Sequence, residues 1–276
     1  MKLRLMSNNL WWCDLNHDAW AEMGENCSNA SRAPGFARLY GEVMPHVIGF
    51  QECSGRMGHT LMMHISQAGL PYAMLWGKDT PIAYRKDLFE LVDSWFYLYP
   101  EEIPGLEGAF NNLNTKSYSI ALLRLKETGQ LLLFATTHLW YKSDAACPGS
   151  EDAKAWQVER LVDKLDELQG QYDCPAVVVG DFNTWPAAKA IRAAKARGFA
   201  HAHDVATEFA DETCGHHFCC DKGFDTQVSE GGFEKSLDHI LVRGVKEGAV
   251  CRYERSYADY YMPLSDHFPL WIDMEL

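Results

Sequence analysis

The chain has 276 residues, of which 47% are hydrophobic and 23% charged, and its net charge at pH 7 is −13. These proportions are ordinary for a folded globular protein and exclude a disordered or low-complexity chain. No apolar stretch approaches the roughly 20 residues of a membrane-spanning helix. Lys and Arg are scattered, which disfavours a protein that holds long nucleic acids through many phosphates. A small phosphorylated substrate is compatible with the negative net charge, because one bound cation can supply the positive charge that the phosphate needs.

The N-terminus alternates charged and apolar residues, as a strand does, and lacks the apolar core of a signal peptide. We therefore predict a cytoplasmic protein. The nine cysteines are an odd number, and without a secretion signal we expect them to be mostly reduced, buried thiols. No repeat, linker or compositional break divides the sequence, so we predict a single domain over 1–276.

Strands and helices are predicted along the first part of the chain from the spacing of apolar residues. In order, these are a strand over 2–10, a helix over 32–44, a strand over 47–52, a helix over 57–69 and strands over 72–76, 81–84 and 89–98. Pro45 follows the first helix and Gly69 the second, as expected for residues that end helices.

The second part begins with a predicted loop over 101–116, rich in Pro, Gly and Asn. The spacing then predicts strands over 118–125 and 131–138, a helix over 150–169, a buried strand over 175–180, a helix over 187–197, a loop-rich region over 200–234 and strands over 236–243, 250–255 and 268–275. Ser150 is expected to cap its helix and Gly170 to end it. Pro186 is expected at the start of the next helix.

Polar side chains stand at the ends of these apolar strands. Asp181 and Asn183 are two positions apart, so in a strand they share one face. Any such residue alone is usual in a turn, but the set together suits one chemistry. Carboxylate and amide oxygens are ligands for Mg²⁺ or Mn²⁺, and a His beside an Asp supplies an oriented imidazole. Metal-assisted phosphoester hydrolysis needs both the metal ligands and the oriented imidazole. The residues are Asn9, Glu52, His138, Asp181, Asn183, Asp238, Asp266 and His267.

The sequence around these residues resembles the endonuclease/exonuclease/phosphatase superfamily, the metal-dependent group with the deoxyribonuclease-I-like fold. The resemblance covers almost the whole chain, with the motifs in the family's order. It implies an α/β (α+β) fold, a four-layered α/β/β/α sandwich of two mixed β-sheets packed face to face with helices outside. The motifs are Ser7-Asn-Asn9, Val47-Ile-Gly-Phe-Gln-Glu52, Thr137-His138-Leu, Gly180-Asp-Phe-Asn183, Leu237-Asp-His-Ile-Leu-Val and Ser265-Asp-His267-Phe-Pro-Leu.

The resemblance also implies a role for each matching residue. Glu52 would be the principal metal ligand, with Asn9 and Asp266 helping to hold the metal or its waters. Asp181 would orient or deprotonate the attacking water. Asn183 would hold a phosphate oxygen.

The histidines complete this implied arrangement. His267, oriented by Asp238, would stabilise the pentacovalent phosphorus or move a proton, and His138 would contact the phosphate or protonate the leaving oxygen. The spacing leaves the identity of the general base open. Lys116 is a candidate for the family's basic residue in the mid-chain loop. His239 departs from the family, which commonly has an aromatic residue there.

The predicted function is therefore a phosphoester hydrolase that uses Mg²⁺ or Mn²⁺ and in-line attack of an activated water. Its predicted substrate is a small or lipid-linked phosphodiester or phosphomonoester. A nuclease is the alternative, which the acidic balance disfavours, and a non-catalytic binding module on the same fold is the competing class. Residues 214–221 contain Cys and His without the spaced pairs of a structural zinc site, so we interpret them as a substrate-side loop.

Overall fold

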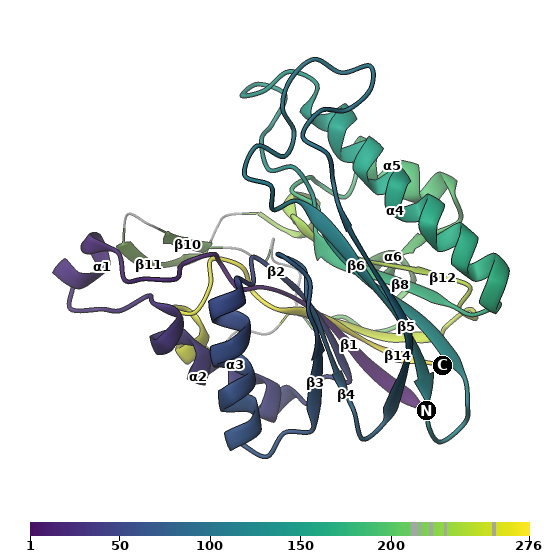
Figure 1. The fold of residues 1–276 in the computed structure, drawn as a ribbon, viewed down its shortest axis with the longest axis horizontal. Coiled ribbons are helices and arrows are strands. Elements are labelled where there is room, and N and C mark those ends of the chain that lie inside the picture. Colours follow the sequence, from purple (N-terminus) through teal and green to yellow (C-terminus); the bar gives the residue numbers. More distant parts are fainter. Residues whose placement is uncertain (211–214, 216, 221–222, 229–230, 256–257) are drawn as a thin grey trace.

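The computed structural model of the protein describes residues 1–210, 215, 217–220, 223–228, 231–255 and 258–276. Two six-stranded sheets face one another, and the longer helices lie on their outer sides (Figure 1). The predicted α/β/β/α sandwich of two mixed sheets is confirmed. In the part of the chain that the structure describes, no helix is long and apolar enough to cross a membrane.

The first sheet brings the two ends of the chain together. Its strand order is β13 (Val250–Arg255), β14 (Leu270–Glu275), β1 (Lys2–Asn9), β2 (Val47–Gln51), β4 (Ile82–Arg85) and β3 (Tyr72–Leu75). β1 and β2 are parallel, with Asn9 opposite Gln51, so Asn9 and the residue after β2, Glu52, reach the same edge of the sheet. Two helices cover its outer face, α2 (Asn29–Val43) and α3 (Gly55–Gln67).

In the second sheet, the pairing of neighbouring strands places three polar residues side by side. Its strand order is β5 (Phe89–Leu98), β6 (Ser117–Leu125), β7 (Leu131–His138), β8 (Ala176–Asp181), β12 (Asp238–Arg243) and β9 (Ala200–His201). His138 pairs with Asp181 across the parallel strands β7 and β8, and Asp181 pairs with Asp238 across the antiparallel strands β8 and β12. The outer face is covered by α4 (Ser150–Tyr172) and α5 (Lys189–Ala196).

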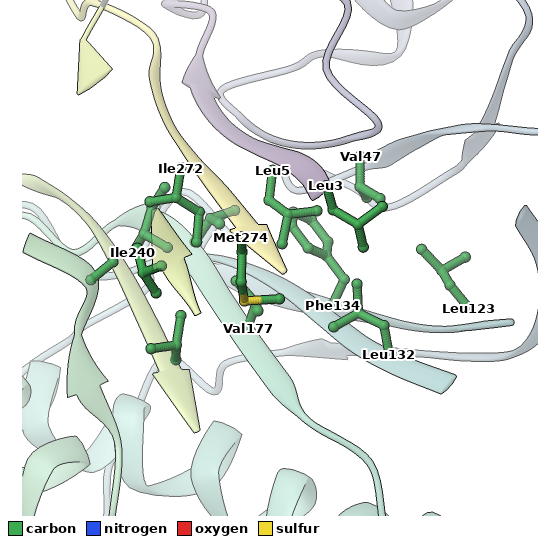
Figure 2. Close-up of a cluster of buried hydrophobic side chains, with 14 of the residues drawn as sticks. Leu3, Leu5, Val47, Leu123, Leu132, Phe134, Val177, Ile240, Ile272 and Met274 are labelled. Carbon is green, nitrogen blue, oxygen red and sulfur yellow. The ribbon is translucent and has the colours of Figure 1, made fainter. Parts of the chain in front are cut away.

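The central core lies between the two sheets, where alternate side chains such as those of Leu3 and Leu5 point inward (Figure 2). Leu3 and Leu5 of β1 pack there with Phe134 of β7 and Val177 of β8, all of them fully buried. Each large apolar side chain buried in this way contributes roughly 1.5–3 kcal/mol. Rigid, interlocked sheets therefore support the strand ends from both sides.

Two glycines allow backbones to approach closely beneath the polar strand ends. A Cβ atom on Gly180 would lie 2.1 Å from the carbonyl oxygen of Thr137 on β7. A Cβ atom on Gly49 would lie 2.4 Å from Val179 Cγ2 of the facing sheet. Gly180 therefore allows the neighbouring strands β7 and β8 to approach closely.

The predicted boundaries of several helices are wrong for local reasons. Gly149, not Ser150, is the N-cap of α4, because Ser150 Oγ accepts a hydrogen bond from Trp140 Nε1 at 3.1 Å and donates one to Cys147 O at 2.6 Å. The same helix continues through Gly170 and ends at Tyr172. Pro186 precedes α5 by a turn, because the helix begins only at Lys189.

Short elements occupy regions where no helix or strand was predicted. They are α1 (Asp18–Glu22), α6 (Ala202–Val205), β10 (His217–Cys220), β11 (Gly223–Val228) and the 3₁₀ turns η1 (Phe233–Lys235) and η2 (Asp259–Tyr261). Of the proposed substrate-side loop over 214–221, residues 214, 216 and 221 lie outside the described residues.

Candidate active site

The candidate site lies where β1, β7 and β8 end and β12 begins, next to the residue that follows β2. Asn9 joins the two sheets there, since its Nδ2 donates to Asp181 Oδ2 at 3.2 Å and to Glu52 Oε1 at 3.4 Å. Its Oδ1 accepts from the backbone N–H of Trp11 at 2.9 Å. The Asn9 side chain thus fixes both predicted carboxylates and the start of the following loop.

Glu52 adopts a left-handed backbone conformation with φ +55°, which is uncommon for a residue with a side chain. Its Oε2 accepts a hydrogen bond from the Trp12 backbone N–H at 2.8 Å. The carboxylate is therefore held from two sides, by Asn9 and by Trp12, and strain of this kind persists where the surroundings enforce it.

His138 is the centre of a buried chain of polar groups. Its Nδ1 donates to Asp79 Oδ2 at 2.6 Å, and its Nε2 lies 2.5 Å from Lys116 Nζ. The same Nε2 lies 3.6 Å from Asp181 Oδ2 and 3.8 Å from Glu52 Oε1. Asp79 thereby fixes the imidazole so that Nε2 points toward the carboxylates.

Asp79 is the site residue that sequence reasoning missed. It belongs to the turn between β3 and β4 and carries none of the recurring motifs. The signal available was a polar Asp-Thr pair directly before the strand that starts after Pro81. Lys116, by contrast, lies where a basic residue of the mid-chain loop was expected, and it is 5% exposed.

The second histidine has its own carboxylate partner. His267 Nδ1 and Asp238 Oδ2 are 2.7 Å apart, and His267 Nε2 lies 4.0 Å from Asp181 Oδ2. The Ser265 hydroxyl accepts from the His267 backbone N–H at 3.2 Å and donates to Asn9 O at 2.8 Å. These bonds anchor the loop before β14 to the end of β1.

Asp181 and Asn183 do not simply share a strand face, because β8 ends at Asp181 and Asn183 is left-handed with φ +50°. The Asn183 backbone N–H donates to Asp181 Oδ1 at 2.8 Å, which forms a turn closed by the side chain. Asn183 Nδ2 donates to Leu139 O at 3.2 Å. The two side chains are adjacent nonetheless, at the end of β8.

Opposite charges set the pKa values on one side of the site. Burial alone would raise the pKa of Glu52, but the facing His138 and Lys116 side chains and the Trp12 N–H lower it to about 2. Burial lowers the pKa of Lys116, against the opposing effect of the nearby carboxylates. Glu52 is therefore an ionised oxygen donor at every physiological pH.

Carboxylate crowding sets the pKa values on the other side. Burial raises the pKa of Asp181, opposed by His267, and the charge of Asp238 adds to the rise. Burial and the charges of Glu52 and Asp181 bring the pKa of Asp266 to about 7. The pKa of His267 lies well above its usual range despite burial, because Asp238 is hydrogen-bonded to it.

This arrangement fits a hard divalent cation. Ligand atoms of Glu52, His138 and Asp181 lie within 4.8 Å of one another, and the same holds for Asp181, Asp238 and His267. A cation would favour the ionised carboxylates against burial and crowding, which raise the pKa of Asp181 and Asp266. Oxygen donors suit Mg²⁺ or Mn²⁺. Asp266 belongs to neither group, although its pKa responds to both Glu52 and Asp181.

Two cavities open beside the cluster and share Tyr141. The cavity on the Glu52 side has a volume of about 540 Å³, and the one on the Asn183 side has a volume of about 620 Å³. The first is lined by Trp12, Glu52, Asp79, Leu113, Thr115, Lys116, His138 and Tyr141. The second is lined by Tyr141, Ser143, Asp144, Ala145, Glu151, Lys154, Asn183, Thr184, Trp185, Ala187, Ala188 and Leu237.

The model of the endonuclease/exonuclease/phosphatase family matches residues 9–267. The chain belongs to this family. Members of the family are phosphoester hydrolases that generally depend on a divalent metal, and the chain is an enzyme of this class. No curated protein is significantly similar in sequence.

Solved structures share the fold over their whole length. A mannosyl-6-phosphatase from Bacteroides thetaiotaomicron has a TM-score of 0.76 and 21% identity, over 99% of this chain and 100% of its own. An endonuclease/exonuclease/phosphatase family protein from the same organism has a TM-score of 0.75 and 21% identity, over 99% of this chain and 98% of its own. TDP2 of D. rerio, complexed with a single strand DNA product, has a TM-score of 0.63 and 17% identity, over 100% and 99%.

A second pair of histidines lies next to the site. Because the His203 N–H donates to His201 Nδ1 at 3.1 Å, His201 Nε2–H donates to His239 Nδ1 at 2.9 Å. His239 Nε2–H then donates to Thr184 O at 2.8 Å. This series of hydrogen bonds requires the imidazoles of His201 and His239 to be neutral. This explains the departure at 239, where the imidazole has a specific polar partner.

The charge on Asp79 is predicted to matter for turnover. An Asp79→Asn variant keeps the shape but presents an amide that can donate to His138 Nδ1, which permits the wrong ring orientation. We expect kcat for an aryl phosphate ester to fall about 10- to 100-fold. Asp87→Asn, at an exposed ion pair with Arg85, is the matched control and should leave kcat unchanged. A kcat within about twofold of the wild type for Asp79→Asn would refute the role.

The histidine pair predicts an acid sensitivity of the fold. Burial lowers the pKa of His239 from 6.5 to about 4 and also lowers the pKa of His201 well below its usual range. Between these pH values the unfolded chain binds protons that the folded chain does not, so stability is full above pH 6.5 and falls as the pH drops toward 4. The loss from His239 is on the order of 3 kcal/mol.

The free energy of unfolding, measured with denaturant at several pH values from 7 to 4.5, gives the size of this loss. The His239→Gln variant, which cannot titrate, should be less stable at pH 7 and lose less stability on acidification. His59→Gln, at an exposed site, should follow the wild type. Equal pH slopes for wild type and His239→Gln would show that the pair is not responsible.

Proposed function

We propose that the chain hydrolyses a small or lipid-linked phosphodiester or phosphomonoester with Mg²⁺ or Mn²⁺ as cofactor. The observation that carries the proposal is the convergence of Glu52, Asp181 and two carboxylate-paired imidazoles at one edge of the sandwich. Its class of chemistry follows from the family. We further propose that residues 1–276 act as one catalytic domain.

Glu52 is proposed as the principal metal ligand, with Asn9 and Asp266 holding the metal or its waters. A bound Mg²⁺ or Mn²⁺ supplies charge neutralisation at phosphoryl oxygens and lowers the pKa of a coordinated water. Glu52 suits this role because its low pKa keeps it ionised, and because Asn9 and Trp12 fix both of its oxygens.

Asp181 is proposed to orient the attacking water and to accept its proton. It lies between the Nε2 atoms of His138 and His267, at 3.6 Å and 4.0 Å. Its raised pKa is the direction a general base near neutral pH requires. Asn183 is proposed to donate its remaining Nδ2 hydrogen to a phosphate oxygen, since the other is used by Leu139 O.

The two imidazoles are proposed to act at two positions of the reacting phosphoester. His267, kept protonated by Asp238, is proposed to stabilise the negative charge that grows on the oxygens of the pentacovalent phosphorus. His138, with Lys116 bonded to its Nε2, contacts the phosphate or supplies the proton to the leaving oxygen. Asp238 and Asp79 orient the two rings.

The substrate class is supported by charge and shape. The chain carries 38 acidic against 25 basic residues, so a polyanionic substrate that contacts many phosphates is disfavoured. The cavities beside the cluster are of the size that small ligands occupy. A structure of the same fold is named a mannosyl-6-phosphatase, and another is a complex with DNA.

A phosphoester screen tests this function. We expect turnover of bis-p-nitrophenyl phosphate or p-nitrophenyl phosphate with Mg²⁺ or Mn²⁺ and none after EDTA treatment. KM for the preferred substrate should change little between low and moderate salt, whereas a nuclease that binds several phosphates loses affinity steeply. Steep salt dependence with cleavage of single-stranded DNA would favour the nuclease, and no activity with any divalent ion would favour a binding module.

Separate variants test the division of labour between metal binding and chemistry. Glu52→Gln should weaken Mn²⁺ binding, measured by calorimetry, by 10-fold or more, because it removes the ionised oxygen donor. His267→Ala should bind Mn²⁺ nearly as the wild type does and lower kcat by about 100-fold or more. Equal loss of metal affinity in both variants would contradict the assignment.

A further inference from the structure

Outside the catalytic cluster, a compact group of soft ligands lies in the loop that follows β1. Cys13 Sγ and Cys27 Sγ are 3.3 Å apart, and a ring nitrogen of His17 lies within 4.8 Å of both sulfurs. Cys13 is 3% and Cys27 0% exposed, while His17 is half-buried. We propose that Cys13, His17 and Cys27 bind a thiophilic divalent transition metal of the Zn²⁺ class.

The distances are close to those of such a site. Zn²⁺ binds Cys sulfur at about 2.3 Å and His nitrogen at about 2.0–2.1 Å, which separates two tetrahedral sulfurs by roughly 3.8 Å. The sulfurs of Cys13 and Cys27 need only a small side-chain rotation to reach that spacing. A disulfide would require the two sulfurs to approach to about 2.05 Å, and it would give His17 no role as a ligand.

The backbone around the sulfurs is arranged as a support. The His17 N–H points at Cys27 Sγ at 3.4 Å, and donors of this kind stabilise metal-bound thiolates. Leu15 O lies 3.0 Å from Cys13 Sγ and 3.9 Å from Cys27 Sγ, so this carbonyl, or a water in its place, offers the fourth position. His17 also stacks on Trp11, with ring centroids 5.9 Å apart, which orients its ring.

A buried cation holds the loop in this form without the metal. Arg32, 1% exposed, donates to the carbonyl oxygens of Cys27 at 2.6 Å and of Cys13 at 2.9 Å. Its positive charge also offsets the two thiolates that a bound metal requires. On binding, the metal forms two metal–sulfur bonds and one metal–nitrogen bond, and the two thiol protons pass to solvent.

The site is distinct from the catalytic cluster but adjoins it. Trp12, one residue before Cys13, donates its N–H to Glu52, and Trp11 donates to Asn9. A metal at Cys13 and Cys27 therefore fixes the wall of the active site without contacting substrate.

Co²⁺ titration of the reduced full-length protein tests the proposal. We expect one equivalent of Co²⁺ to give a thiolate-to-cobalt charge-transfer band, which oxygen ligands of the catalytic cluster cannot produce. The band should persist in Glu52→Gln, be lost in Cys13→Ser and Cys27→Ser, and persist in the matched control Cys251→Ser. Because this readout involves no turnover, it is independent of the proposed catalytic function.

Alkylation of the wild type covers the case in which a cysteine variant fails to fold. In peptide mass spectrometry, Zn²⁺ should slow the modification of Cys13 and Cys27 by N-ethylmaleimide at least 10-fold and leave Cys251 unchanged. Absence of the charge-transfer band, its survival in both Cys13→Ser and Cys27→Ser, or unprotected Cys13 and Cys27 would overturn the proposal.

Discussion

The hydrogen bonds of the Asn9 amide join the two sheets at the place where the candidate site is built. Its Nδ2 reaches Asp181 of one sheet and Glu52 of the other, so the relative position of the two carboxylates depends on one short, neutral side chain. A charged side chain there would pair with one carboxylate and repel or mask the other. The neutral amide leaves both negative charges available while it fixes the distance between them.

The charges at the sheet edge are stable only as a set. Removing carboxylates and ammonium groups from water is costly unless each has a partner of opposite charge. Lys116 and the two imidazoles are interleaved with four buried or half-buried carboxylates, Glu52, Asp79, Asp181 and Asp238. Loss of any one member leaves a neighbour uncompensated, so single substitutions in this set act on the fold and on the chemistry together.

Sequence patterns were informative where local rules decide the structure. The buried strands and the residues at their ends follow from apolar runs and recurring motifs, and backbone register then brings His138, Asp181 and Asp238 side by side. Asp79 could not be found in this way, because its role depends on a contact with His138, far away in sequence.

Local rules also failed where a tertiary contact competes with them. Ser150 is a good N-cap residue, but its hydroxyl is used by Trp140 and Cys147, so Gly149 takes the cap position. His239 replaces the family's aromatic residue because His201 supplies a matching donor. Trp140 and His201 belong to other segments than the residues they contact, which periodicity within one element cannot reveal.

Arg32 shows how such a site can diversify. Its guanidinium donates to five main-chain oxygens, those of Leu10, Trp11, Cys13, Cys27 and Leu264, and its Nη2 also lies 3.5 Å from Asn29 Oδ1. Every residue type carries the same carbonyl, so these five bonds do not depend on the side chains of the residues that accept them. Substitution of Trp12, whose exposed side chain lines a cavity beside the site, can therefore change what the site recognises while its backbone N–H still holds Glu52. Specificity can evolve there at little cost to the catalytic geometry.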